Sequence, residues 1–186
     1  AAKMAKADGV AVELEAAAFE RCFHIHPSQL GRLRRFYDVA ATDVAGYQSY
    51  ATKIARLLAD EAAMLRAVLE SLFVIATADG VLHEREARFL AEVARCFGIS
   101  DAEFLDLRHI FVLEPGNPYQ VLGLSPSTCD AGLRQRYLEL VRENHPDALM
   151  ARGVPHEFLA LADRKLAAIN AAYEEIRRAR VAGVSA

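Results

Sequence analysis

The sequence has little proline and no low-complexity tract. Only six of its 186 residues are proline, and most lie near expected element boundaries. Because proline interrupts helices and alanine and leucine favour them, the long proline-free, Ala/Leu-rich segments predict an all-α protein. The apolar fraction of 53% is typical of a globular chain. The length suits one or two domains.

Long hydrophobic runs are also missing. The best candidate, Ala62 to Ala78, is interrupted by Arg66 and Glu70, so no segment reaches the roughly 18 apolar residues that a membrane-spanning helix needs. Lys3 and Lys6 lie where a secretory signal would carry its apolar core, so we expect no signal peptide. The chain begins at Ala1, which suggests that something N-terminal has been removed.

Neither the cysteine content nor the net charge indicates a metal-binding or nucleic-acid-binding protein. The three cysteines, Cys22, Cys96 and Cys129, are odd in number and lack metal-ligand spacing, as in a reduced cytosolic protein. The net charge is −3, made of −4 before Pro115 and +1 after it. Neither part is basic enough for nucleic acid to be the favoured partner.

The most informative motif is His145-Pro146-Asp147. A helical pattern ends at Asn144 and another resumes near Pro155, which suits a first helical position. Since proline disfavours helical geometry in the residue before it, we expect an exposed turn. The preceding helix is expected to begin at a Ser127 or Thr128 cap. Matched apolar spacings on both sides predict an antiparallel helical hairpin; they involve Leu133, Tyr137, Leu140 and Val141, then Leu159, Ala162, Leu166, Ile169, Tyr173 and Ile176.

Several motifs in order make residues 117–180 resemble a J domain, the module of DnaJ/Hsp40 co-chaperones. They are the Asn-Pro-Tyr opening at residue 117 with its Val-Leu-Gly-Leu at 121–124, Leu-Arg-Gln-Arg-Tyr at 133–137, the tripeptide, and Ile-Asn-Ala-Ala-Tyr-Glu at 169–174. The resemblance implies binding to ATP-bound Hsp70 (DnaK) and stimulation of its ATP hydrolysis, with no bond chemistry in this chain. It also implies the Hsp70-binding residues His145, Pro146, Asp147, Arg134, Arg136, Tyr137, Leu138 and Arg142.

The chain departs from the J-domain pattern near the tripeptide. Leu138 and Glu139 replace the basic residues that usually follow the tyrosine, and Ala148 replaces a frequent lysine. At 100° per residue, Arg134, Leu138 and Arg142 share one outer ridge of the helix. We therefore predict a less electrostatic docking face, with weaker salt dependence of Hsp70 binding.

Four other interpretations stay open. Arg134, Arg136 and Arg142 are also explained as a solvated helix face. His145 and Asp147 are also explained as a cap at a helix end. A scaffold or sensor with an inactive J domain is favoured by Leu138, Glu139 and Ala148. An enzyme using His145 and Asp147 as a base pair is disfavoured, because no nucleophile or phosphate-binding glycine loop lies nearby.

The N-terminal part contains an internal repeat. Ala-Asp-Gly-Val occurs at residues 7–10 and again at 78–81, each copy followed by acidic residues and a Cys-Phe pair. With helices expected near 28–39, 47–58, 61–78 and 101–112, the last opened by a capping box at Ser100 and Glu103, this predicts a bundle with pseudo-twofold character. It resembles the TerB (tellurite-resistance-B-like) domain. A TerB-like region followed by a J domain resembles the DjlA family of DnaJ-like proteins.

We therefore predict a TerB-like bundle at 1–114, a linker at 115–117 and a J domain at 118–182. The family typically carries a membrane anchor N-terminal to this region, so we expect a cytoplasmic protein tethered by a segment that this chain does not contain. The bundle is expected to recruit an unknown client or partner, to locate the J domain, or to self-associate as a homodimer.

A weaker hypothesis is that four acidic residues of the repeat bind a metal ion. Asp8, Glu15, Asp79 and Glu86 could supply oxygen ligands to a hard cation, and TerB-like domains are suspected of binding metal. Carboxylates at helix starts ordinarily act as caps, and His24, His26 and His83 are weaker candidates still. We favour capping and predict neither a metal nor a cofactor.

Overall fold

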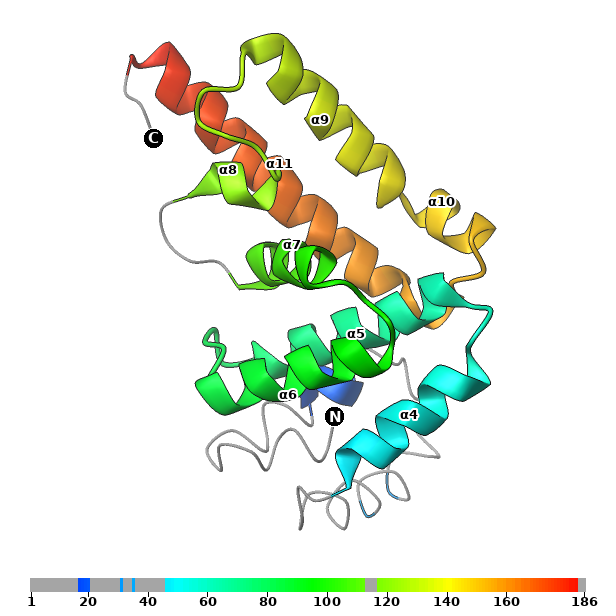
Figure 1. Ribbon diagram of the computed structural model, residues 1–186. Coiled ribbons are helices and arrows are strands. Elements are labelled where there is room, and N and C mark those ends of the chain that lie inside the picture. The colour runs from blue at the N-terminus through cyan, green and yellow to red at the C-terminus, as the bar shows by residue number, and fades with distance from the viewer. Residues whose placement is uncertain (1–16, 21–30, 32–34, 36–45, 113–116, 184–186) are drawn as a thin grey trace.

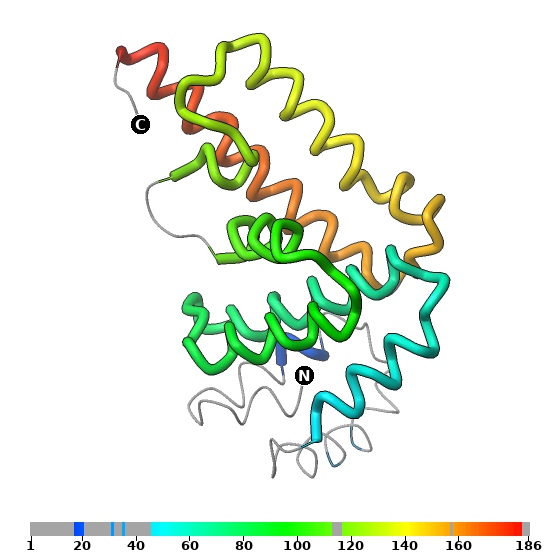
Figure 2. The backbone as a smooth tube through the Cα atoms, in the orientation of Figure 1, coloured from blue at the N-terminus to red at the C-terminus, as the bar shows by residue number. Residues whose placement is uncertain are grey.

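The computed structural model describes residues 17–20, 31, 35, 46–112 and 117–183. This part of the chain is helical and contains no strand, which confirms the predicted all-α class. Figures 1 and 2 show the chain path. The helices are α4 (Tyr47–Leu57), α5 (Ala62–Ala76), α6 (Glu84–Cys96), α7 (Asp101–Phe111), α8 (Pro118–Val121), α9 (Asp130–Glu143), α10 (Pro146–Ala151), the short 3-10 helix η1 (His156–Phe158) and α11 (Leu159–Val181).

Helices α4 to α7 form a bundle around the almost fully buried α5. Phe73 and Ile75 of α5 are inaccessible to solvent, as are Leu90 of α6 and Leu107 of α7. Helix α7 begins as predicted, because the Ser100 hydroxyl accepts from the Glu103 amide and the Glu103 carboxylate accepts from Ser100. Burial of such large side chains, roughly 1.5–3 kcal/mol each, is the main stabilisation of the bundle.

The second copy of the predicted repeat has the expected helix, turn and helix. Gly80 adopts a positive φ of 93°, and the Asp79 carboxylate accepts a hydrogen bond of 2.9 Å from the Val81 amide. The first copy and the helix expected at 28–39 lie mostly outside the described residues. The pseudo-twofold relation therefore stays a prediction.

The predicted helical hairpin is present. Helices α9 and α11 lie side by side and run in opposite directions, and α8 packs against α11 between the hairpin and α7 (Figure 1). The Tyr137 and Tyr173 rings stack with centroids 4.0 Å apart. Leu133, Leu140, Ile169 and Ile176 are buried between the helices, together with Tyr119 and Leu122 of the α8 region.

Three boundaries of the hairpin differ from the prediction. The residue before α9 is Cys129, with no side-chain cap, so neither Ser127 nor Thr128 caps the helix. A short helix, α10, follows His145 where only a turn was expected. Pro155 precedes η1, and α11 begins at Leu159. Proline still suits the start of a helix, but Pro146 takes that position instead of Pro155.

The hairpin packs directly on the bundle. Val154, Phe158 and Leu161 are buried against Ala67 and Val74 of α5, and α7 contacts both α8 and α11. Residues 113–116, which hold most of the predicted linker, lie outside the described residues. The hairpin and the bundle thus share a buried apolar junction, and this junction fixes where the His145 turn lies.

Candidate functional site: the His145 turn and the outer face of α9

The turn at His145 presents its carboxylate to solvent. His145 precedes α10, and its Nδ1 accepts a hydrogen bond of 3.3 Å from the Asp147 amide. One Asp147 carboxylate oxygen lies 3.6 Å from the same nitrogen, yet the Asp147 side chain is 82% exposed. The capping role considered from the sequence is therefore realised by His145. It leaves Asp147 free to reach another molecule.

The turn is held from both sides. Pro146 occupies the first position of α10, where its fixed φ suits the helix and its missing N–H costs no bond. Arg152, just after α10, donates a 2.7 Å hydrogen bond to the carbonyl of Glu143 at the end of α9. Asn144 is buried and donates to the Leu140 carbonyl at 2.8 Å. Asp147 therefore projects from a rigid corner.

The outer face of α9 leads up to this corner. Arg134, Leu138 and Arg142 line one shallow surface groove with Ala131, Gln135 and Glu139, as their spacing predicts. Leu138 is 39% exposed, among the exposed large apolar side chains of the described chain. The groove thus combines two cations and one carboxylate, that of Glu139, with an apolar centre.

Two predicted binding residues point elsewhere. Arg136 donates to the Leu122 carbonyl at 3.3 Å and lies 3.5 Å from a Glu139 oxygen, towards the junction with the bundle. Tyr137 stacks on Tyr173, and its hydroxyl donates to Asn170 at 3.0 Å. Both side chains have partners within the hairpin, so the structure does not bring them together with Arg134, Leu138 and Arg142.

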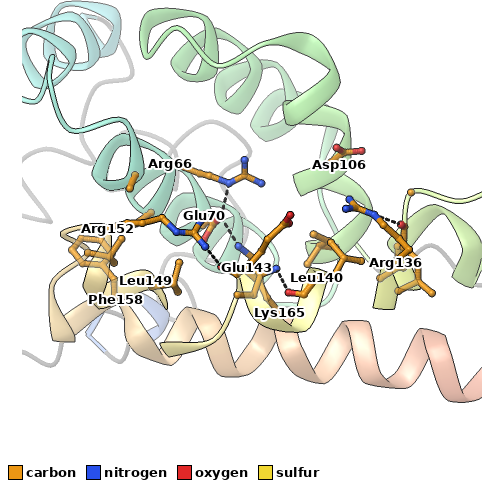
Figure 3. A pocket seen from close by; sticks show the side chains of 18 residues that line it. Arg66, Glu70, Asp106, Arg136, Leu140, Glu143, Leu149, Arg152, Phe158 and Lys165 are labelled. Atoms are coloured by element: carbon orange, nitrogen blue, oxygen red, sulfur yellow. Dashed lines mark hydrogen bonds and ion pairs between the residues drawn. The ribbon is translucent and has the colours of Figure 1, made fainter. Parts of the chain in front are cut away.

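Sequence reasoning missed a buried ion pair at the junction. Lys165 Nζ of α11 lies 2.8 Å from Glu70 Oε1 of α5, with the two side chains only 4% and 6% exposed (Figure 3). Burial lowers the pKa of Lys165, while Glu70 opposes that shift. Lys165 is three residues after Ala162 and four before Ile169, on the apolar seam. A lysine at a position where the spacing predicts an apolar residue was the sequence signal for this buried pair.

Asp79 and Glu86, the described half of the proposed metal set, already have protein partners. The Glu86 carboxylate is buried and accepts from the His83 amide at 3.0 Å. The Val81 amide, with a smaller contribution from the His83 side chain, lowers the pKa of Asp79. Asp8, Glu15, His24 and His26 lie outside the described residues. Among the residues that the structure describes, no group of three or more potential ligands gathers.

Among the described residues, no helix combines the length and the apolar character that crossing a bilayer requires.

Comparison with known proteins identifies relatives for both parts of the chain. The Photobacterium profundum protein named co-chaperone protein DjlA is 27% identical, over 94% of this chain and 73% of the relative. The Coxiella burnetii and Escherichia coli K12 proteins of the same name are 29% and 30% identical over 63% and 62% of this chain. The chain spans about half the length of these two, 50% and 51%.

No solved structure matches the chain. The sequence profile described as "Tellurite resistance protein TerB" matches residues 1–109, which cover α4 to most of α7 and more than half of the chain. The chain therefore belongs to the TerB family and is similar in sequence to DjlA co-chaperones.

Proposed function

We propose that this protein is a DjlA-like co-chaperone of Hsp70 (DnaK), and that its hairpin, the predicted J domain at 118–182, stimulates ATP hydrolysis by the ATP-bound partner. The observation that carries the proposal is the rigid corner at which Asp147 stands 82% exposed. The DjlA relatives support the same role.

The docking face extends from Asp147 along the outer side of α9. Arg134 and Arg142 would attract an acidic partner surface and set its orientation, since interface charges affect association rate and register more than raw affinity. Leu138 would add apolar contact between them. His145 and Pro146 would shape the turn, and Arg136 and Tyr137 would contribute mainly by holding the hairpin together.

The proposed role involves no making or breaking of covalent bonds by this chain. His145 and Asp147 are 53% and 82% exposed, so water would screen any effect of one group on the other. A general base needs a shaped site that positions a substrate proton within reach. The proposed action is therefore mechanical and electrostatic, exerted on the ATPase site of the partner.

The TerB bundle, predicted at 1–114 with a linker at 115–117, would recruit a client or partner, locate the hairpin, or self-associate. With DnaK as the proposed partner, we propose that the protein acts in the cytoplasm. Membrane tethering by an N-terminal segment remains a prediction from the family.

A single-turnover ATPase assay of a cognate DnaK tests the proposal. The wild-type chain should accelerate hydrolysis, and Asp147→Asn should abolish the acceleration. Asp163→Asn, which makes the same change at an exposed residue of α11, is the matched control and should act as wild type.

The other outcomes separate the alternatives. Failure of the folded wild-type chain to stimulate DnaK would favour a scaffold with an inactive J domain. ATP hydrolysis by the chain without DnaK would favour an enzyme. Full stimulation by Asp147→Asn would contradict the role proposed for this carboxylate.

A further inference from the structure

A cavity of about 260 Å³ separates the hairpin from the bundle beside the buried ion pair. Its walls come from α5 and α7 on one side and from α8 to α11 on the other, as Figure 3 shows in close-up. It lies on the inner side of the hairpin, away from the groove formed by Arg134, Leu138 and Arg142. The proposed docking of Hsp70 makes no use of this cavity.

Cationic side chains from both parts of the molecule converge on the cavity. Arg66 comes from the bundle, whereas Arg136, Arg152 and Lys165 come from the hairpin. In Figure 3 the ends of Arg66, Arg152 and Lys165 gather around Glu70. Like charges brought this close repel one another unless an anion lies between them.

Carboxylates of the protein neutralise only part of this positive charge. Arg66 and Lys165 both contact the same oxygen of Glu70, at 3.2 and 2.8 Å. Arg152 donates to a neutral carbonyl, that of Glu143. Glu70 thus compensates Lys165 and part of the charge of Arg66, which also lies 3.6 Å from a Glu103 oxygen. After burial itself, Arg66 and Arg152 further lower the pKa of Lys165.

Lys165 also has hydrogen-bonding capacity to spare. An ammonium group carries three donors, and within the described residues Lys165 makes one hydrogen bond, to Glu70. Buried donors without a partner are costly. A ligand that accepts hydrogen bonds and carries negative charge would satisfy both requirements of the site.

Two further carboxylates of the cavity wall oppose an anion only weakly. Asp106 and Glu143 belong to the lining, but both residues are exposed. Water therefore screens their charge far more than that of Lys165, which is buried. The buried charges of the lining are thus Lys165 and its partner Glu70, and the half-buried Arg66 and the exposed Arg152 add positive charge beside this pair.

The volume restricts the ligand to a small one. Sites for drug-sized molecules occupy roughly 300–1,000 Å³, somewhat more than the 260 Å³ found here. A group of a few oxygen atoms fits, and fork-shaped guanidinium groups bind such groups well.

We propose that this junction cavity is a binding site for a small oxyanion of the phosphate type, held by Lys165, Arg152 and Arg66. Because the ligand would contact both α5 and α11, its binding would stabilise the packing of the hairpin against the bundle. The site would thus link the arrangement of the two parts to the supply of a phosphate-type anion.

The test uses the whole chain and inorganic phosphate. Melting temperature is measured against phosphate concentration, with sodium chloride at matched ionic strength as reference, and the dissociation constant is measured by calorimetry. At about ten times that constant, phosphate should raise the melting temperature by about 3–6 °C more than chloride does. Arg152→Gln should weaken phosphate binding at least tenfold.

Matched variants make the result specific. Arg88→Gln removes an exposed arginine of α6 that does not line the cavity, and it should bind phosphate as the wild type does. If Arg152→Gln does not fold, Arg66→Gln takes its place with the same expected loss. The proposal is overturned if phosphate acts no differently from chloride, or if the folded cavity variant binds phosphate as tightly as Arg88→Gln.

Discussion

The outer face of α9 and the inner junction use charged side chains in opposite ways. On the outside, the Asp147 side chain is 82% exposed, and one of its carboxylate oxygens lies 3.6 Å from Nδ1 of His145. At the junction, the Lys165 side chain is 4% exposed and fixed to Glu70. An exposed charge contributes little to stability and is available to a partner, whereas a buried charge requires a partner inside the protein. The comparison separates residues that act outwards from residues that fix the arrangement.

The largest expected effect on stability comes from breaking the junction pair. Lys165→Ala leaves the buried Glu70 carboxylate without its ammonium partner, although Arg66 still lies 3.2 Å away. This should lower the free energy of unfolding by about 3 kcal/mol or more. Urea denaturation of the whole chain measures this loss.

A double variant sharpens the same point. Lys165→Met combined with Glu70→Leu removes both charges and keeps apolar volume, so it should recover most of the lost stability. A double variant as unstable as Lys165→Ala would contradict the view that the single change acts through an uncompensated buried charge.

Arg180 provides a second inward-facing case at the other end of α11. Its guanidinium donates to the Tyr119 hydroxyl at 3.1 Å, to Asp130 at 2.5 Å and to the Thr128 carbonyl at 2.6 Å, so it joins the α8 region, the following loop and α9. Arg180→Ala should cost about 2 kcal/mol, measured by urea denaturation. Arg178→Ala, at an exposed neighbour, is the control and should cost much less.

Much of this arrangement follows from local sequence patterns. The seam from Leu159 to Ile176 predicts the hairpin, and Ser100 with Glu103 predicts the start of α7, because both signals lie within a few turns of helix. Spacing likewise placed Leu138 on the outer face with two arginines.

The rest depends on contacts that local patterns do not contain. Helix α10 has only six residues, too few for a periodic signal, and its Leu149 packs against the junction. Glu70 and Lys165 are 95 residues apart, so only the assembled fold reveals that they meet. The J-domain resemblance implies a docking role for Arg136, and its hydrogen bond to the Leu122 carbonyl, on a different element, forms only in the folded chain.

A smaller effect is expected on the outer face. Leu138→Lys adds a charge between Arg134 and Arg142, which should tighten DnaK binding about two- to fivefold at low salt and lose that gain at high salt. Binding measured across a salt series checks this, with Leu138→Gln as the uncharged control. A wild-type chain whose affinity already falls as steeply with salt as that of Leu138→Lys would contradict the predicted apolar character of the groove.

The smallest expected effect concerns Tyr47, whose burial is intermediate between that of the exposed Asp147 and that of the buried Lys165. Burial and the hydrogen bond to Glu92 raise the pKa of Tyr47 to about 12. The unfolded chain loses this proton near pH 10, so the associated stability is present below about pH 10 and is lost as pH rises towards 12.

Urea denaturation at about pH 9 and about pH 11 measures that loss. The free energy of unfolding should fall less in Tyr47→Phe than in the wild type, because the substituted ring cannot ionise. An equal fall in both proteins would show that Tyr47 does not contribute.

The most direct test of the outward role is the ATPase activity of DnaK with Asp147→Asn, measured on protein whose urea midpoint has been compared with wild type. We predict an unchanged midpoint and no stimulation of ATP hydrolysis, because this carboxylate acts only on the partner. Stimulation at the wild-type level by the folded variant would contradict the account.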